Sequence, residues 1–205
     1  MRLNGFLLAI FFTLDLKCQV DTSYYRNGAV KAIGKVNEEA KKEGNWIFYY
    51  PDGTQSAMLN YRKGELNGLQ SYFYPNGQIA GIENWRKDLL EGSAKYYYSN
   101  GQPEKKGSYH EGLYEGNWIF HFENGNPKRN GFYDKGLPQG SWNFYFENGQ
   151  LNQTGKLIDG KEDGLWKYFD EDGNSTYEGK WEKGEKVGQW FYFKNGKKKK
   201  WKFFD

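Results

Sequence analysis

Cysteine, histidine and proline are scarce in this sequence. The 205-residue chain has one cysteine, two histidines and five prolines. A single cysteine excludes a disulfide framework and a zinc site built on thiolates. The histidines, His110 and His121, stand at different points of the sequence pattern described below and fit a polar strand surface. The net charge of +3 is too small to indicate a nucleic-acid partner, and we expect none.

The sequence also lacks a unique cluster of acidic residues. Carboxylates recur beside glycine-rich turns, at Asp52, Glu123, Asp163 and Asp172. A glycosidase needs two carboxylates facing each other in a cleft, and no copy of the pattern supplies such a pair. The glycines precede no predicted helix, so they form no phosphate-binding loop. We therefore expect no enzymatic activity, no catalytic residue, no metal site and no cofactor.

Long apolar runs are absent except near the N-terminus. Residues 6–14 are apolar and follow one positive charge, but a membrane-spanning helix needs about 20 such residues. The pattern predicts a signal peptide over residues 1–19 and a secreted or periplasmic protein. One alternative is a lipid anchor on Cys18. Asp15 and Lys17 depart from the usual signal for such an anchor, which has an apolar and a small residue at these positions. Another is a buried N-terminal strand in a cytosolic protein.

Glycine is abundant, and nearly all of the 27 glycines follow one period. An opening glycine recurs every 24 residues and defines seven copies, at Gly44, Gly68, Gly92, Gly116, Gly140, Gly164 and Gly188. A second glycine, preceded by Asn or Asp, follows nine residues after the opening glycine in six copies. In the seventh copy it follows after eight residues, at Gly196. A fixed period of this length is the sequence signature of a repeat array.

Aromatic residues make up 20% of the chain and share the same period. Two residues after the opening glycine stands Trp46, Trp118, Trp142, Trp166 or Trp190, with Gln70 and Ala94 in the other two copies. A second aromatic follows two residues later in every copy. Alternate aromatics closed by Asn-Gly or Asp-Gly predict a strand entering a hairpin, with positive φ tolerated at both turn residues. Glycine in the returning strand is expected to let a neighbouring ring lie across the backbone.

These patterns predict an all-β fold. We expect an elongated single-layer antiparallel sheet of about seven 24-residue β-hairpin repeats over residues 44–205, preceded by a degenerate capping repeat over residues 20–43. Equivalent rings of successive copies are expected to lie side by side in aromatic columns. The segment 37–42 has the only helical composition, and we expect at most one helical turn there.

The string G-x-x-x-G-x-W-x-Y/F-Y/F-x-x-N-G resembles the MORN-repeat variant family from Tyr24 to about Phe204. The resemblance implies an array of hairpins. It also implies a protein-binding or membrane-associated accessory module, and some similar proteins are labelled antitoxins. Choline-binding cell-wall repeats share the Gly-x-Trp-Tyr-Tyr motif but lack the preceding G-x-x-x-G, so they match this sequence less well.

A further aromatic stripe lies five residues after the opening glycine and is expected to face away from the tryptophans. It consists of Tyr49, Phe73, Tyr97, Tyr145, Phe169 and Phe193, with His121 in the remaining copy. We interpret the chain as a non-catalytic scaffold that binds a protein partner through this stripe, at the cell envelope or outside the cell. The structural alternative is that curling of the sheet covers the stripe.

Three other functions stay open at the level of sequence. The chain fits an antitoxin or immunity-type protein that neutralises a toxin. Exposed rings would also suit glycan binding. The lysines at 197–200 suit attraction to an anionic membrane surface, and they equally suit protection of a terminal sheet edge against further pairing.

Overall fold

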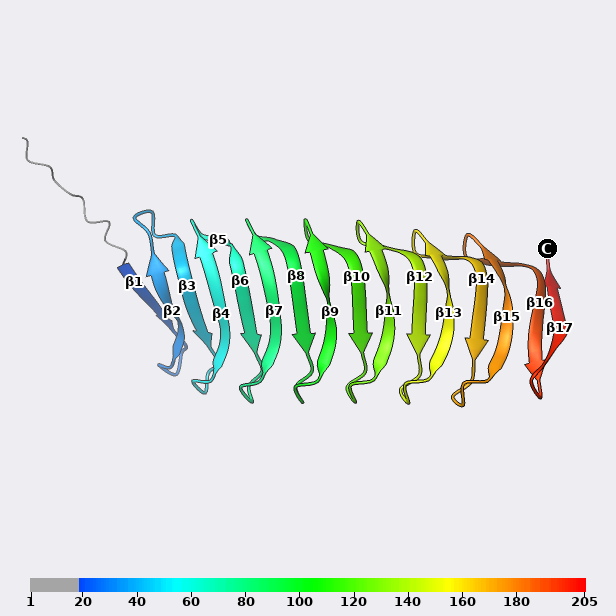
Figure 1. Ribbon diagram of the computed structural model, residues 1–205. Helices are drawn as coiled ribbons and strands as arrows, with labels where there is room; N and C mark the ends of the chain where they lie inside the picture. Colours follow the sequence, from blue (N-terminus) through cyan, green and yellow to red (C-terminus); the bar gives the residue numbers. More distant parts are fainter. Residues whose placement is uncertain (1–18) are drawn as a thin grey trace, which may run out of the picture.

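The computed structural model describes residues 19–205, which form one open antiparallel sheet of 17 strands and contain no helix (Figure 1). Successive strands pair with each other along the chain, and β5 and β6 are two pieces of one strand that both pair with β4. The expected all-β hairpin array is confirmed. The strands are β1 (Gln19–Tyr24), β2 (Val30–Val36), β3 (Lys42–Tyr49), β4 (Gln55–Arg62), β5 (Glu65–Leu66), β6 (Gly68–Phe73), β7 (Ile79–Arg86), β8 (Leu89–Tyr97), β9 (Pro103–His110), β10 (Leu113–His121), β11 (Pro127–Asp134), β12 (Leu137–Tyr145), β13 (Leu151–Ile158), β14 (Lys161–Phe169), β15 (Ser175–Glu182), β16 (Glu185–Lys194) and β17 (Lys197–Phe204).

The two ends of the sheet are β1 and β17. Residues 20–43 supply the hairpin of β1 and β2, and the lysines 197–200 lie on β17, which pairs only with β16 among the described residues. The predicted signal over residues 1–19 and the alternative anchor at Cys18 fall almost wholly outside the described residues. Within those residues, no helix is long and apolar enough to span a membrane.

The Asn-Gly turns are three-residue loops, and only their glycine has positive φ. In the second repeat, Gly77 has φ of 82° and donates its N–H to the Tyr74 carbonyl at 2.8 Å. The Asn76 Oδ1 accepts the N–H of Gln78 at 3.1 Å, and its Nδ2 donates to the Ser99 carbonyl of the next repeat at 2.8 Å. The expectation of positive φ at both residues is therefore wrong here. The asparagine instead ties neighbouring turns together.

Two-residue turns occur at the opposite edge and once at the end of the array. Lys135 and Gly136 have φ of 48° and 82°, as a type I′ turn requires. In the last repeat, Asn195 and Gly196 have φ of 53° and 71°, which explains why that glycine comes one residue early. The segment 37–42 contains no helical turn, because the Asn37 side chain accepts backbone N–H groups of its own loop.

In the five copies with tryptophan, the opening glycine starts a β-bulge that faces the preceding strand. Gly164 has φ of 75°, and the pairs on either side leave Gly155 alone opposite residues 164–166. The Trp166 ring lies on Gly155, where a Cβ would come within 2.2 Å of the indole. The indole Nε1 donates to the Lys156 carbonyl at 3.1 Å. The bulge, the glycine and the tryptophan therefore form one unit.

The same pairing of glycine and tryptophan recurs along the sheet, as expected for glycine in the returning strand. A Cβ on the glycine would lie 2.1–2.3 Å from the indole in the pairs Gly34–Trp46, Gly107–Trp118, Gly131–Trp142, Gly155–Trp166 and Gly179–Trp190. The two copies without tryptophan also lack the glycine. Leu59 takes the place of the glycine in the copy that has Gln70, and Glu83 takes it in the copy that has Ala94. Gln70 is fully buried and bridges the Asn60 N–H and carbonyl, at 2.6 and 3.1 Å.

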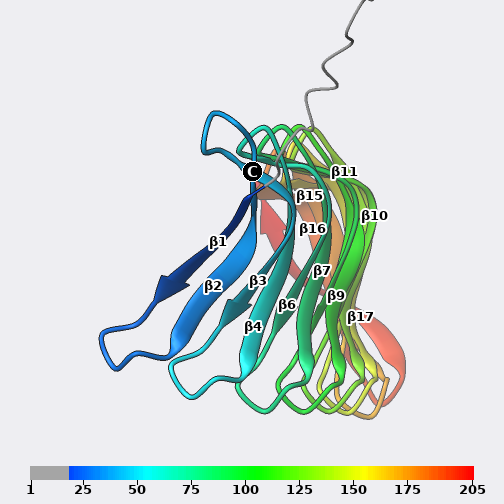
Figure 2. The same cartoon turned by 90° about the vertical axis from the view of Figure 1, so that its left-hand side faces the viewer.

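The five tryptophans are 0–2% exposed, although the described residues form no second layer over the sheet. Rings from other positions surround them: the Trp118 ring centroid lies 4.2 Å from that of Tyr114 and 5.0 Å from that of Tyr109. Tyr114 contacts Tyr133, which contacts Trp142 of the next repeat. The ring columns expected along the array are present, but they are built from rings of different positions, because equivalent tryptophans lie two strands, roughly 10 Å, apart. Figure 2 shows that the strands bend, so the sheet is curved along the direction of its strands.

Candidate functional site

The aromatic stripe expected to bind a partner is half-buried throughout. Its members stand two residues before the turn loops and are Tyr49, Phe73, Tyr97, Tyr145, Phe169 and Phe193. Tyrosines of the preceding repeat hold the stripe's backbone: the Tyr50 hydroxyl donates to the Phe73 carbonyl at 2.8 Å, and that of Tyr74 to the Tyr97 carbonyl at 2.7 Å. The stripe thus takes part in contacts between repeats.

His121 occupies the seventh place in this stripe. Burial lowers the pKa of its imidazole, and the nearby charge of Lys106 lowers it further, so the ring is neutral at pH 7. Phe193 lines a hollow at the last turn together with residues such as Asp170 and Asn195. The structure therefore spreads the predicted site residues along the array and does not gather them around one cavity.

The opposite side of the sheet, which we call the tryptophan face, carries a position that varies from copy to copy. It pairs with the second aromatic of each repeat and is occupied by Ala57, Gly81, Lys105, Arg129, Gln153, Tyr177 and Lys199. The Lys105 ammonium lies 4.4 Å from the Tyr96 ring centroid, and the Arg129 guanidinium lies 4.4 Å from that of Phe120. The constant frame therefore presents different chemistry at each repeat.

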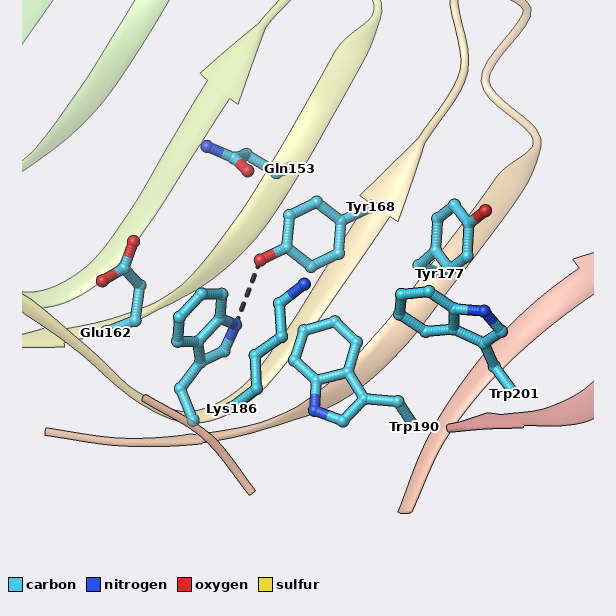
Figure 3. A pocket seen from close by; sticks show the side chains of 8 residues that line it. Gln153, Glu162, Tyr168, Tyr177, Lys186, Trp190 and Trp201 are labelled. Carbon is cyan, nitrogen blue, oxygen red and sulfur yellow. Dashed lines mark hydrogen bonds between the residues drawn. The ribbon is translucent and has the colours of Figure 1, made fainter. Parts of the chain in front are cut away.

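Near its C-terminal end, the tryptophan face is hollowed into a cavity of about 550 Å³, which we call the aromatic groove (Figure 3). Five consecutive strands, β13 to β17, contribute its walls. The lining residues are Gln153, Glu162, Tyr168, Tyr177, Trp181, Lys186, Trp190 and Trp201.

Hydrogen bonding and ring contacts fix the walls of the aromatic groove. The Trp181 Nε1 donates to the Tyr168 hydroxyl at 3.0 Å, the dashed line in Figure 3. Burial raises the pKa of Tyr168, which keeps this phenol neutral. The rings of Tyr177 and Trp201 are 5.1 Å apart and are 41% and 47% exposed. Two large rings are therefore accessible beside a buried, rigid wall.

Lys186 brings a positive charge into the aromatic groove. Its ammonium lies 4.5 Å from the Trp190 ring centroid, 5.5 Å from that of Trp181 and 5.6 Å from that of Trp201. Glu162 is the only acidic residue among those that line the groove. The lining includes no histidine, cysteine or serine, so the arrangement suits binding through aromatic and ionic contacts.

The sequence interpretation missed Tyr177, Lys186 and Trp201. A signal for Tyr177 was available, because the residue at its position changes from copy to copy while the neighbouring ring positions stay aromatic. Trp201 was hidden by the shortened last turn, which changes the register of β17 against β16.

The fold defines a class of protein: a β-hairpin repeat scaffold whose tryptophan face differs from repeat to repeat. The sequence model described as "MORN repeat variant" matches residues 42–63, 66–87, 90–111, 138–157 and 162–183, together more than half of the chain. The chain belongs to this family. No curated protein matches the sequence.

Solved structures give only distant likenesses. The chain is 12% identical to a chain of the crystal structure of TcdB2-TccC3-Cdc42, with a TM-score of 0.20. The alignment covers 85% of the present chain and 13% of that chain. It is also 12% identical to a chain of the Tc holotoxin pore of Photorhabdus luminescens, with a TM-score of 0.24. This alignment covers 85% of the present chain and 11% of that chain. It thus spans a small part of these much longer chains, and TM-scores this low carry no information on function.

Proposed function

We propose that this protein is a non-catalytic repeat scaffold that binds a protein partner through the aromatic groove. The observation that carries the proposal is the exposed pair Tyr177 and Trp201 beside the ammonium of Lys186. Tyrosine and tryptophan contribute disproportionately to protein–protein binding energy when they lie in a partly enclosed setting of this kind.

Charge on the tryptophan face defines the chemistry of the partner. Lys105 and Arg129 lie on rings of this face, and Lys186 lies in the groove itself. A partner segment with acidic and apolar side chains complements this combination. An extended chain rises about 3.3 Å per residue, so one that runs along the array advances one repeat, roughly 10 Å, every three residues.

The partner is proposed to lie at the cell envelope or outside the cell. This location depends on the signal peptide predicted over residues 1–19, with a lipid anchor through Cys18 as the alternative. A toxin neutralised in that compartment is one partner of the proposed kind, and it would make the protein an immunity-type member of its family.

Replacing both Tyr177 and Trp201 by alanine is expected to weaken partner binding at least tenfold while the array stays folded. Both side chains are more than a third exposed, so their loss creates little cavity. The measurement is recovery of partners by the tagged protein from its own host, compared between wild type and variant. The matched control is Leu137→Ala with Leu165→Ala, which removes two side chains that are equally exposed and lie outside the groove.

Unchanged recovery of every partner by the groove variant would contradict the proposal. Two further measurements distinguish the other binding functions. Retention on insoluble cell-wall material that disappears in the groove variant would assign the groove to glycans. Flotation with anionic vesicles that requires residues 197–200 would assign the C-terminal edge to a membrane surface, and 0.5 M salt should abolish it.

A further inference from the structure

One place on the tryptophan face breaks the glycine–tryptophan rule twice. In the third repeat, Ala94 stands where five other copies have tryptophan, and its strand partner is Glu83, where the corresponding copies have glycine. Without the indole, a hollow of about 370 Å³ remains, which we call the Glu83 pocket. It is lined by Tyr72, Ala80, Gly81, Glu83, Trp85 and Tyr96.

Glu83 is a buried carboxylate whose charge has no cationic partner among the described residues. The residue is 8% exposed. Its Oε2 accepts the Trp85 Nε1–H at 2.8 Å, and its Oε1 accepts the Tyr96 hydroxyl at 2.6 Å. Both donors are neutral. The nearby Lys105 ammonium lies over the Tyr96 ring and donates to the Tyr114 hydroxyl at 3.1 Å. A buried carboxylate left with neutral donors alone is costly, and a bound cation would offset that cost.

Two of the rings around Glu83, Tyr72 and Trp85, have faces that neither another ring nor a cation of the described residues covers, whereas the Lys105 ammonium already lies over the Tyr96 ring. In the neighbouring repeat, Tyr114 packs on Trp118 with ring centroids 4.2 Å apart. No such ring contact joins Tyr72, Trp85 or Tyr96 to another ring of the described chain. Burial raises the pKa of both tyrosines, and the charge of Glu83 raises it further, so both phenols stay neutral. Neutral aromatic faces attract cations through their quadrupole.

The type of cation follows from the acceptors that remain. Each Glu83 oxygen already accepts a hydrogen bond, and the pocket is otherwise lined by rings, Ala80 and the backbone at Gly81. Each Glu83 oxygen keeps one free acceptor site, so a primary ammonium group could place at most two of its three N–H donors on the carboxylate. A quaternary ammonium group brings positive charge and methyl groups but no N–H, which fits aromatic walls over a buried carboxylate.

We propose that the Glu83 pocket binds the quaternary ammonium group of a small ligand of the choline class. This site lies on other repeats than the aromatic groove and does not depend on the function proposed for that groove. The contribution of Glu83 is electrostatic, and the rings of Tyr72 and Trp85 supply the contact surface.

The test is a titration of the full chain with choline, followed by NMR or calorimetry. Choline is expected to bind saturably and at least tenfold more tightly than 3,3-dimethylbutan-1-ol, its neutral carbon analogue, or ethanolamine, its primary-amine analogue. Glu83→Gln is expected to weaken choline binding at least tenfold. The double variant Glu83→Gly/Ala94→Trp restores the pair found in five other places, fills the hollow, and is expected to abolish binding without lowering the thermal midpoint.

Three results would overturn the proposal: no saturable choline binding, equal binding of choline and its carbon analogue, or choline binding that survives in Glu83→Gly/Ala94→Trp. The comparison of ligands on the wild-type chain decides the matter even where Glu83→Gln fails to fold. A further arm distinguishes two sources of the ligand. Phosphatidylcholine vesicles that bind the wild type and not the double variant indicate a lipid headgroup, whereas binding of free choline alone indicates a soluble compound.

Discussion

Gly155→Ala is expected to destabilise the protein by about 1–3 kcal/mol, because overpacking a rigid core forces neighbours out of place. The new Cβ would lie 2.2 Å from the Trp166 indole, which is 1% exposed and hydrogen-bonded to the Lys156 carbonyl. The ring therefore has nowhere to move without breaking its packing. Chemical denaturation that compares the variant with wild type measures the loss.

Two comparisons make this result specific. Gly81→Ala is the matched control, since its Cβ would meet the Tyr96 ring at 3.2 Å, and we expect a smaller loss. In a Trp166→Ala background, Gly155→Ala should cost little, so the double-mutant cycle should show strong coupling between the two positions. A Gly155→Ala variant as stable as wild type would show that the indole does not rest on this glycine.

Trp118→Ala is expected to cost about 3–5 kcal/mol, the range for truncating a large buried aromatic. Trp118 is fully buried and contacts the rings of Tyr109, Tyr114 and Phe120. Because each repeat contacts only its neighbours, the loss should be local and should divide the array near its middle. Hydrogen exchange should become fastest in β9 to β11, with slow exchange retained toward both ends.

Uniformly faster exchange along the whole array would contradict this expectation, since it would mean that the sheet unfolds as one unit. Trp46→Ala serves as the comparison, because the same change near the N-terminal end should disturb only the strands around β3. The difference between the two patterns, rather than either alone, tests whether stability is distributed repeat by repeat.

Much of the fold could be predicted because one period governs both the turns and the rings. The opening glycines, the turn glycines and the tryptophans each mark one point of the hairpin, so the hairpin array followed directly. The role of glycine beneath the indole was also predictable, because Gly155 and Trp166 lie on adjacent strands. The ring columns also follow from the period, but which rings touch does not, because contacts between repeats join different positions, such as Phe144 and Trp166.

The candidate sites were harder to predict, because they arise where the repeat is broken. Ala94 stands out in the sequence as an exception, but its direct pairing with Glu83 emerges only from the strand register. Trp201 reaches Tyr177 because the turn at Asn195 and Gly196 is one residue shorter than its equivalents. A pattern defined by what the copies share cannot show what a single copy does differently.

Removal of one whole repeat tests most directly whether contacts between neighbouring repeats hold this sheet together. Deleting residues 116–139 joins Glu115 to Gly140 and preserves the period, so β9 would pair with β12 as it now pairs with β10. Small-angle X-ray scattering should show a folded particle shortened by roughly 10 Å, the width of two strands. An unfolded scattering profile, or a particle of unchanged length, would contradict the account.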